Sequence, residues 1–449
     1  MQKFNYKSME ALRADILSQG LELDVSDDVS ALLQKVSLPG ISICNSMAVL
    51  PMEGCDGDEY GAPGELTIRR YLRFARGGAG IVWFEAIAVV PEGRGNPRQL
   101  CINEKTAEAF AGLLRRMRAA ARESGREPPF IIAQLTHAGR YARPRGAPEP
   151  VTAQRHPLLD EKYRNTPPRI IADEELPLLE DAFAKAAALA GQAGFDAVDV
   201  KACHRYLISD FFSAYDRPGL YGGSYENRAR LFLNIIDRIN ALPSPIAITP
   251  RINAYDALPY PLGFGSDEKN RPFLIEPLKL LADMKLRGVK MANISCGNPY
   301  YNPHVGRPFD NGPYMPPESQ LKLSARMLNI ISEMQRSQPR MAIVCTGLSW
   351  FRQFGANVAA AGIKNGCWTI AGFGRQSLAY PDFAADIINL GGMKPEKCCA
   401  ACSGCTQIMR DGGSAGCTVR DGEIYLPILK KGRAGRPVPT PQTLCDHII

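Results

Sequence analysis

The spacing of apolar and polar residues divides most of the chain into short apolar runs separated by longer amphipathic stretches. The apolar runs have the length and composition of strands that are buried on both faces, as in a parallel sheet. Eight such runs follow one another: MAVLPM (47–52), GIVWFEAIAVV (80–90), FIIAQL (130–135), DAVDVK (196–201), IAITPRI (246–252), MANIS (291–295), MAIVCTG (341–347) and WTIAGFG (368–374). The pattern predicts eight buried parallel strands.

Amphipathic stretches lie between most of these runs and predict helices. They span residues 104–124, 178–193, 227–242, 273–287 and 318–335. Strand followed by helix, repeated, fits either a closed (β/α)8 barrel or an open doubly wound sheet. No Gly-x-Gly-x-x-Gly turn follows a strand to mark the dinucleotide site of a doubly wound sheet. The sequence therefore favours an α/β fold of the TIM (β/α)8 barrel type.

The chain divides into three parts. Residues 1–38 mix charges with a loose helical spacing and predict an N-terminal helical extension. Residues 39–392 form the predicted barrel. Residues 393–449 contain a dense group of cysteines and predict a C-terminal segment with chemistry of its own.

Composition narrows the function classes. The net charge of +7 is spread along the chain without the basic runs of nucleic-acid-binding proteins. The sequence has no signal-peptide pattern and no apolar stretch long enough to span a membrane, so we expect a soluble cytoplasmic protein. In that compartment the 13 cysteines predict free thiols or metal ligands in place of a disulfide framework.

Functional residues of such a barrel lie where each strand enters the following loop. The polar, cysteine and small residues at these positions are Glu85, Ala86, Gln134, His137, Lys201, His204, Tyr206, Arg251, Cys296, His304, Gly347, Gly374 and Arg375. Any one of them is more often structural than functional. Their coincidence at one barrel mouth predicts a site.

A flavin needs a phosphate cradle, a hydrogen-bonding edge for its pyrimidine ring and a cation near N1 and the C2 carbonyl. Gly374 and Arg375 lie at a strand-to-helix turn that suits a phosphate, and Gly347 could supply a second loop. Gln134 could pair with the ring edge, and Arg251 could supply the cation.

Five segments carry a family resemblance. They are PME (51–53), GIVWFEAIAV (80–89), QLTHAGR (134–140), YGGSYENRAR (221–230) and AGFGR (371–375). In order and spacing they resemble the landmarks of the Old Yellow Enzyme (NADH:flavin oxidoreductase) family over roughly residues 40–390. The resemblance implies an FMN-dependent oxidoreductase.

By this resemblance, the positions around FMN are Pro51, Met52, Glu53, Ala86, Gln134, Arg251, Gly347, Gly374 and Arg375. Glu53 is a departure, because the family usually has a small hydroxylated or similar residue there. The YGGSYENR segment is interpreted as scaffold, with Glu226 and Asn227 holding loops and helix ends.

The resemblance also implies catalytic residues for hydride transfer to an activated C=C bond. Tyr206 matches the family tyrosine that delivers the proton, and Lys201 and His204 stand where the family places an oxygen-binding pair. Lys201 replaces a common histidine; it could bind an enolate or an anionic substrate, or it could equally face a neighbouring carboxylate. His304, in a Gly- and Pro-rich loop, is either a second acid or a structural histidine.

The C-terminal cysteines predict a metal centre. Two residues separate Cys399 from Cys402 and Cys402 from Cys405, and eleven residues separate Cys405 from Cys417. Four thiolates so spaced can hold a [4Fe–4S] cluster, although four cysteines also make a structural zinc site. The iron–sulfur branch of the family, which includes 2,4-dienoyl-CoA reductases and trimethylamine dehydrogenase, carries a similar run after its barrel, so the resemblance favours the cluster.

Cys398 offers another interpretation of the same run. Cys398, Cys402 and Cys405 have the spacing of radical S-adenosylmethionine enzymes. Those enzymes place this motif early in the chain and usually have an aromatic residue where this chain has Gly404, so this interpretation is disfavoured. Cys398 is then a spare thiol or a neighbour of the cluster.

The route of electrons to the flavin stays open. Residues 418–449 are too few for the nucleotide-binding domains that larger relatives carry after the cluster. Either NAD(P)H reduces FMN directly, or a ferredoxin, flavodoxin or flavoprotein subunit delivers electrons through the cluster, and the four cysteines favour the partner protein. The basic residues of the tail, Lys430, Lys431, Arg433 and Arg436, are interpreted as solvated surface in preference to a docking strip.

The leading hypothesis is an ene-reductase that acts on an α,β-unsaturated carbonyl compound. One alternative is a flavin-dependent amine dehydrogenase or demethylase, although Lys201 would repel a cationic amine. The other is a non-catalytic electron-transfer subunit, which Tyr206 and Gln134 argue against. A homo-oligomer is a family-level expectation.

Overall fold

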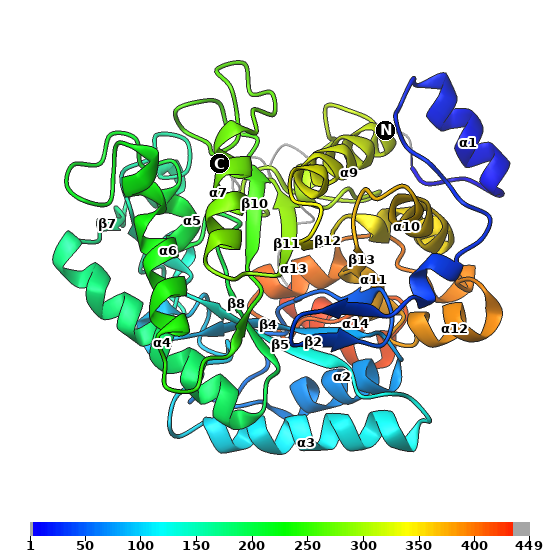
Figure 1. Ribbon diagram of the computed structural model, residues 1–449, viewed down its shortest axis with the longest axis horizontal. Helices are drawn as coiled ribbons and strands as arrows, with labels where there is room; N and C mark the ends of the chain where they lie inside the picture. The colour runs from blue at the N-terminus through cyan, green and yellow to red at the C-terminus, as the bar shows by residue number, and fades with distance from the viewer. Residues whose placement is uncertain (1–2, 434–449) are drawn as a thin grey trace.

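A closed barrel of parallel strands forms the centre of the computed structural model, which describes residues 3–433 (Figure 1). The strands, in the order in which they are hydrogen-bonded, are β10 (Arg251–Tyr255), β11 (Met291–Cys296), β12 (Ala342–Cys345), β13 (Ile370–Phe373), β3 (Met47–Val49), β4 (Ile81–Ala88), β5 (Phe130–Thr136), β8 (Ala197–Val200) and β9 (Ala247–Ile248). All these pairings are parallel. Each of the eight predicted runs contains one barrel strand or, for residues 246–252, β9 and the start of β10.

The fifth position of the barrel is one strand interrupted at Pro250. β9 pairs with β8, while Ala202, just after β8, bridges to Ile252 of β10. Proline has no N–H to donate to a neighbouring strand, which accounts for the break. The sheet therefore closes on itself, and the TIM-barrel prediction is confirmed.

Helices surround the barrel. The predicted helices appear as α3 (Ala107–Glu123), α4 (Leu176–Ala193), α6 (Tyr225–Asn240), α7 (Ile275–Leu286) and α9 (Gln320–Ser337). Three more, α2 (Glu65–Arg76), α10 (Gly355–Lys364) and α12 (Phe383–Leu390), complete the outer layer. No described helix has the length and hydropathy needed to cross a membrane.

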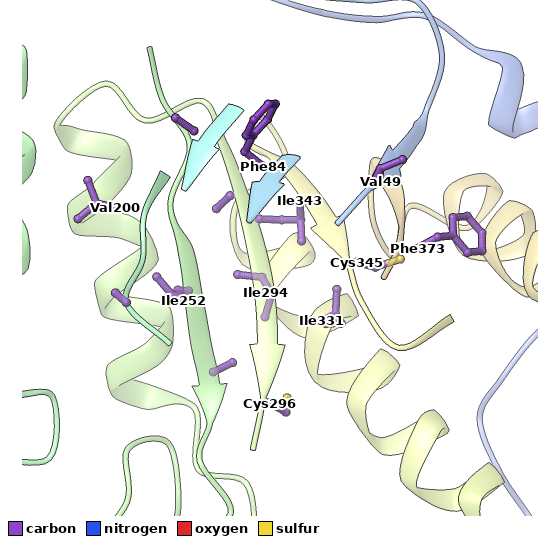
Figure 2. Close-up of a cluster of buried hydrophobic side chains, with 14 of the residues drawn as sticks. Val49, Phe84, Val200, Ile252, Ile294, Cys296, Ile331, Ile343, Cys345 and Phe373 are labelled. Atoms are coloured by element: carbon purple, nitrogen blue, oxygen red, sulfur yellow. The ribbon is translucent and has the colours of Figure 1, made fainter. Parts of the chain in front are cut away.

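Successive strand residues serve two different cores. Val82 and Phe84 of β4 point outward and join the large apolar layer between strands and helices, to which α9 contributes Ile331 (Figure 2). Ile81 and Trp83 point inward and fill the barrel. This alternation follows from the two-residue period of a strand and explains why most strand positions on both faces are apolar.

A small hairpin covers the end of the barrel at which the strands begin. It consists of β1 (Val36–Leu38) and β2 (Ile41–Ile43), and its apolar side chains join the interior core beside Ile81 and Met291. The opposite end of the barrel, where the strands lead into their loops, is therefore the one left for a site.

The N-terminal region packs on the outside of the barrel. It contains α1 (Met9–Ser18) and a short 3-10 turn, η1 (Ser30–Leu33), joined by extended chain. Ser26 and Asn357 of α10 exchange hydrogen bonds of 3.1 and 2.8 Å. The segment predicted as a helical extension thus carries one regular helix.

The C-terminal segment folds across the barrel mouth. It includes α13 (Gly404–Arg410) and α14 (Gly422–Arg433). Asp421 accepts hydrogen bonds from Arg69 and Arg73 of α2 at 2.7 and 2.6 Å, which anchors α14 to the barrel layer. The basic tail residue Arg436 lies outside the described residues.

Candidate active site

A cavity lies at the carboxyl ends of the strands and collects most of the predicted site residues. Its walls include Pro51, Met52, Glu53, Gln134, Lys201, His204, Tyr206, Arg251, Gly347, Gly374 and Arg375. Four of the residues predicted at the barrel mouth do not line it: Glu85, Ala86, His137 and His304. Ala86 is buried in β4, where its carbonyl accepts a hydrogen bond from Gln99, and the His304 ring lies against Tyr314.

Asp199 of β8 organises the inner wall. Its carboxylate accepts hydrogen bonds from Gln134 Nε2 at 2.6 Å, from the Arg251 backbone N–H at 2.7 Å and from Trp83 Nε1 at 2.9 Å. Burial raises the pKa of Asp199 to about 6, while these donors favour its ionised form. The contact with Asp199 leaves the Oε1 atom of Gln134 available to a ligand.

Ser295 of β11 connects two further predicted residues. Its hydroxyl lies 3.1 Å from His204 Nε2 and accepts a hydrogen bond of 3.4 Å from Arg251 Nη2. The Arg251 Nε atom is buried and has no hydrogen-bond partner among the described residues. Burial, followed by the Arg251 and Lys201 charges, lowers the pKa of His204 well below its ordinary value, so the imidazole is neutral at pH 7.

Two glycine turns and Arg375 form the far end of the cavity. Gly347 has φ = +96°, a left-handed backbone angle that favours glycine, and a Cβ atom there would meet the flexible end of the Met327 side chain. Arg375 donates from Nη2 to the Pro308 carbonyl at 2.6 Å, and its Nη1 is buried without a partner in the described chain.

Tyr206 lines the cavity, and its hydroxyl has two hydrogen-bond partners. It donates to Glu53 Oε1 at 2.9 Å, and the Tyr300 hydroxyl lies 2.9 Å from it on the other side. Because Tyr206 donates to the carboxylate, Tyr300 is left as the donor to Tyr206. Burial, Glu53 and Tyr300 raise the pKa of Tyr206 well above its ordinary value, so the phenol keeps its proton.

Lys201 faces the carboxylate, one of the two alternatives that the sequence left open. Its Nζ lies 3.6 Å from Glu53 Oε1 and 3.5 Å from the centre of the Tyr206 ring. Burial lowers the pKa of Lys201, and the Glu53 charge opposes that shift. The two departures from the family pattern, Glu53 and Lys201, therefore form one ion pair.

A buried ionic network fixes the loop that carries Glu53. The Gly54 N–H donates to Glu85 Oε2 at 2.7 Å, and Glu85 in turn accepts from Arg70, which also bonds Asp56. On the other side, the Ala415 N–H donates to the Gly54 carbonyl at 2.6 Å. The loop is thus held between the barrel and the cysteine segment.

The sequence interpretation missed several residues of the outer wall. Tyr300, Arg307 and Arg410 line the cavity, and Tyr141 stacks on Tyr300 with ring centres 3.8 Å apart. They come from loops and from α13, where no periodic pattern marks a side chain as inward-facing. The aromatic, proline-rich composition of 295–308 was the available signal for Tyr300.

The four predicted cysteine ligands gather at one place. Cys399, Cys402, Cys405 and Cys417 line a second, small pocket together with Arg375 and Leu378. Cys405 also lines the main cavity, so the two pockets share a wall. Among residues 3–433, no three His, Cys, Asp or Glu side chains are close enough to hold a single metal ion.

Comparison with known proteins identifies the family of the chain. The model of the NADH:flavin oxidoreductase / NADH oxidase family matches residues 36–298. The chain belongs to this family. The family resemblance seen in its sequence is therefore confirmed.

Individual relatives match over part of their length. The NADPH dehydrogenase of Bacillus pumilus is 32% identical over 227 residues, which are 49% of this chain and 62% of that protein. The NADPH dehydrogenase of Clostridium acetobutylicum is 28% identical over 56% of this chain and 72% of its own. The match with the first relative thus spans less than two thirds of that protein's length.

Solved structures of similar fold come from several enzymes. A 2-naphthoyl-CoA reductase in complex with 2-naphthoyl-CoA has a TM-score of 0.70 and 21% identity, covering 91% of this chain and 58% of that chain. An Old Yellow Enzyme homologue from Zymomonas mobilis has a TM-score of 0.62 and 21% identity, covering 82% and 94%. These likenesses support the barrel fold.

Proposed function

We propose that the protein is an FMN-dependent ene-reductase, which reduces the activated C=C bond of an α,β-unsaturated carbonyl compound. The observation that carries this proposal is the position of the Tyr206 hydroxyl. It keeps its proton, lies between Glu53 and Tyr300, and shares one cavity with the residues that suit a flavin. A proton donor beside a hydride donor is what reduction of such a bond requires.

The cavity has unsatisfied donors in the places that FMN would fill. Arg375 Nη1 is buried without a hydrogen-bond partner in the described chain and lies in the same cavity as the Gly347 and Gly374 turns. This donor and the backbone of the two turns would suit the phosphate. Arg251 Nε is a second buried donor without a partner among residues 3–433, and it would donate to the N1 and C2 carbonyl edge of the flavin. Gln134 Oε1 would accept a hydrogen bond from the ring N–H. Reduced FMN would supply the hydride.

The chain's own residues would complete the reaction. Lys201 and the neutral His204 are placed to donate hydrogen bonds to the carbonyl oxygen, which gains negative charge as hydride arrives at the β-carbon. Tyr206 would give its proton to the α-carbon, and Tyr300, already bonded to Tyr206, would return one to it. Glu53 positions the Tyr206 hydroxyl and holds Lys201 in place.

The cavity charge argues against the amine-dehydrogenase alternative. The charged lining residues are one carboxylate, Glu53, and five cations: Lys201, Arg251, Arg307, Arg375 and Arg410. Glu53 is already paired with Lys201, so a cationic amine would meet net positive charge. The intact Tyr206 arrangement argues against a barrel that has lost catalysis.

Product analysis would test the proposed activity. The FMN-loaded protein, reduced anaerobically with dithionite, is mixed with 2-cyclohexenone or a cinnamaldehyde, and the products are identified by mass spectrometry. We expect stoichiometric cyclohexanone or the saturated aldehyde. In a parallel experiment with the oxidised FMN protein, bleaching of the flavin by trimethylamine or histamine, in the absence of enone reduction, would favour the amine alternative. Inertness toward both classes of substrate would favour an electron-transfer subunit.

We further propose a [4Fe–4S] cluster on Cys399, Cys402, Cys405 and Cys417. Support comes from the convergence of all four on one pocket that shares a wall with the flavin cavity. A zinc ion, the alternative for four cysteines, needs its sulfurs about 2.3 Å from a single point. A cluster places several irons between its ligands and tolerates wider spacing.

Anaerobic purification would test the cluster and the electron route. We expect flavin and iron–sulfur absorption with about four irons per chain. Stepwise addition of NADH, NADPH and a reduced ferredoxin would show which donor bleaches the bands. Zinc in place of iron would remove the relay and leave the ene-reductase proposal intact.

A further inference from the structure

One arginine of the cavity has no side-chain partner among residues 3–433. Arg410, the last residue of α13, lines the cavity with Thr406 and Met409. Its side chain makes no hydrogen bond or ion pair with any of the residues that the structure describes. Burial lowers its pKa, while Tyr300, Tyr314 and the neighbouring Asp411 carboxylate oppose that shift. Asp411 offsets part of its charge, but the guanidinium group is left available to a ligand in the cavity.

Arg307 adds a second charge at the same place. Its Nη1 donates to Ser403 at 3.3 Å, and its Nη2 is buried without a partner in the described chain. Burial and the charges of Arg375 and Arg410 lower the pKa of Arg307. Two guanidinium groups this close repel each other in a partly buried site unless an anion lies between them.

The other cations of the cavity already have assigned partners. Lys201 is paired with Glu53. Arg251 and Arg375 face the positions proposed for the flavin ring and its phosphate. With FMN bound, Arg410 and Arg307 would be the cavity cations that have no anionic partner from the flavin or from Glu53.

We propose that Arg410 and Arg307 bind a carboxylate on the substrate, remote from the C=C bond that is reduced. The proposal rests on the proposed function and narrows its substrate class to unsaturated carbonyl compounds that carry a second, anionic group. Planar guanidinium groups bind carboxylates through paired, charge-assisted hydrogen bonds.

The surroundings favour a carboxylate over a phosphate. The glycine turns that could cradle a phosphate, at Gly347 and Gly374, lie at the Arg375 end of the cavity. Arg410 instead lies at the C-terminal end of α13, where the backbone carbonyls disfavour a doubly charged anion. A monoanion held by two guanidinium groups fits this position.

Matched pairs of ligands would test the site. The ligands are the 3- and 4-carboxylates of benzalacetone and their methyl esters, which share the enone and differ in the remote charge. Binding to the oxidised FMN holoenzyme is followed by the change in flavin absorbance, and turnover is measured separately. The wild-type protein should bind at least one carboxylate about 10- to 100-fold more tightly than its ester.

Variants of Arg410 would show whether the preference for the carboxylate over the ester depends on this residue. In Arg410→Gln the preference for the carboxylate should disappear, with the affinity for the ester within about twofold, and Arg410→Lys should restore part of it. Arg116→Gln is the matched control, because Arg116 of α3 is exposed and lies outside the cavity. It should keep the wild-type preference.

The outcomes separate this proposal from the proposed activity. Equal binding of acid and ester by the wild-type protein, or an equal loss of both in Arg410→Gln, would overturn the anion site whether or not the enone is reduced. Tight carboxylate binding that depends on Arg410, without turnover, would retain the site and refute the ene-reductase proposal. An unchanged visible spectrum and iron content in Arg410→Gln would exclude an effect through the cysteine segment.

Discussion

Tyr206 is the residue on which the proposed chemistry depends. Its hydroxyl is held by two contacts of 2.9 Å, to Glu53 and to Tyr300. In Tyr206→Phe we expect the reoxidation of reduced flavin by an enone to slow by roughly 10²- to 10⁴-fold, because the proton donor is lost. Reduction of the flavin by its donor should change little. Tyr300→Phe, which keeps Tyr206 in place, should have a smaller effect.

Glu53 and Lys201 give the site a distinctive pH dependence. The Glu53 charge raises the pKa of Lys201, against the lowering by burial. In Glu53→Gln the pKa of Lys201 should fall further, so Lys201 loses its proton at lower pH. The alkaline limb of kcat/KM should therefore move toward acid, and it should be absent in Lys201→Met. An unmoved limb in Glu53→Gln would show that Lys201 does not titrate in catalysis.

At the scale of elements, the turn after β12 combines a positive φ with close packing. In Gly347→Ala we expect a strained backbone that shifts the turn at the cavity wall, while the flexible end of Met327 moves to make room for the added methyl group. FMN affinity should fall at least about tenfold, with the free energy of unfolding lowered by more than about 1 kcal/mol.

Gly366→Ala is the control for backbone strain alone. Gly366 also has a positive φ, +65°, but a Cβ atom there would meet nothing within 4 Å, and it lies outside the cavity. The Gly366→Ala variant should lose about 1 kcal/mol of its free energy of unfolding and bind FMN with the wild-type affinity. Equal FMN affinities in the two variants would contradict the role of the Gly347 turn.

The elements also show how far the sequence could predict the fold. The barrel strands were predictable because both faces are buried and most positions are apolar. Helix α2 was not, because its Arg70 points into the protein, where Asp56 and Glu85 neutralise it. A buried ion pair between distant segments leaves no periodic signal. The hairpin β1–β2 is too short to register in the apolar pattern.

The candidate site also contains residues that the sequence could predict and residues that it could not. Residues at strand ends, such as Gln134 and Arg251, follow from the barrel geometry. The Glu53–Lys201 pair required the fold, because the two residues are far apart in the chain and each departs from the family pattern. Arg410 reaches the cavity only through the docking of α13, which depends on contacts that no local pattern records.

For the whole molecule, the buried histidines predict sensitivity to acid. His156 is 1% exposed, and burial lowers its pKa to about 3, below the ordinary value of about 6.5. The unfolded chain therefore binds a proton that the folded chain does not, and stability is lost as the pH falls below about 6.5. Between pH 7.5 and pH 4.5 the His156 contribution should lower the free energy of unfolding by about 2–3 kcal/mol.

Urea unfolding of wild type and His156→Gln at both pH values would isolate this effect. Glutamine cannot titrate, so the variant should lose less free energy of unfolding on acidification than the wild type does. Parallel losses in the two proteins would mean that His156 accepts its proton without penalty in the folded state.

The most direct test of the central claim is a single-turnover experiment. The FMN holoenzyme is reduced anaerobically with dithionite and mixed with 2-cyclohexenone in a stopped-flow instrument, and the return of oxidised flavin absorbance is recorded. We predict reoxidation that saturates with enone concentration, yields one equivalent of cyclohexanone and is slowed strongly in Tyr206→Phe. Flavin that stays reduced in the wild-type protein with a panel of enones and enoates would contradict the account.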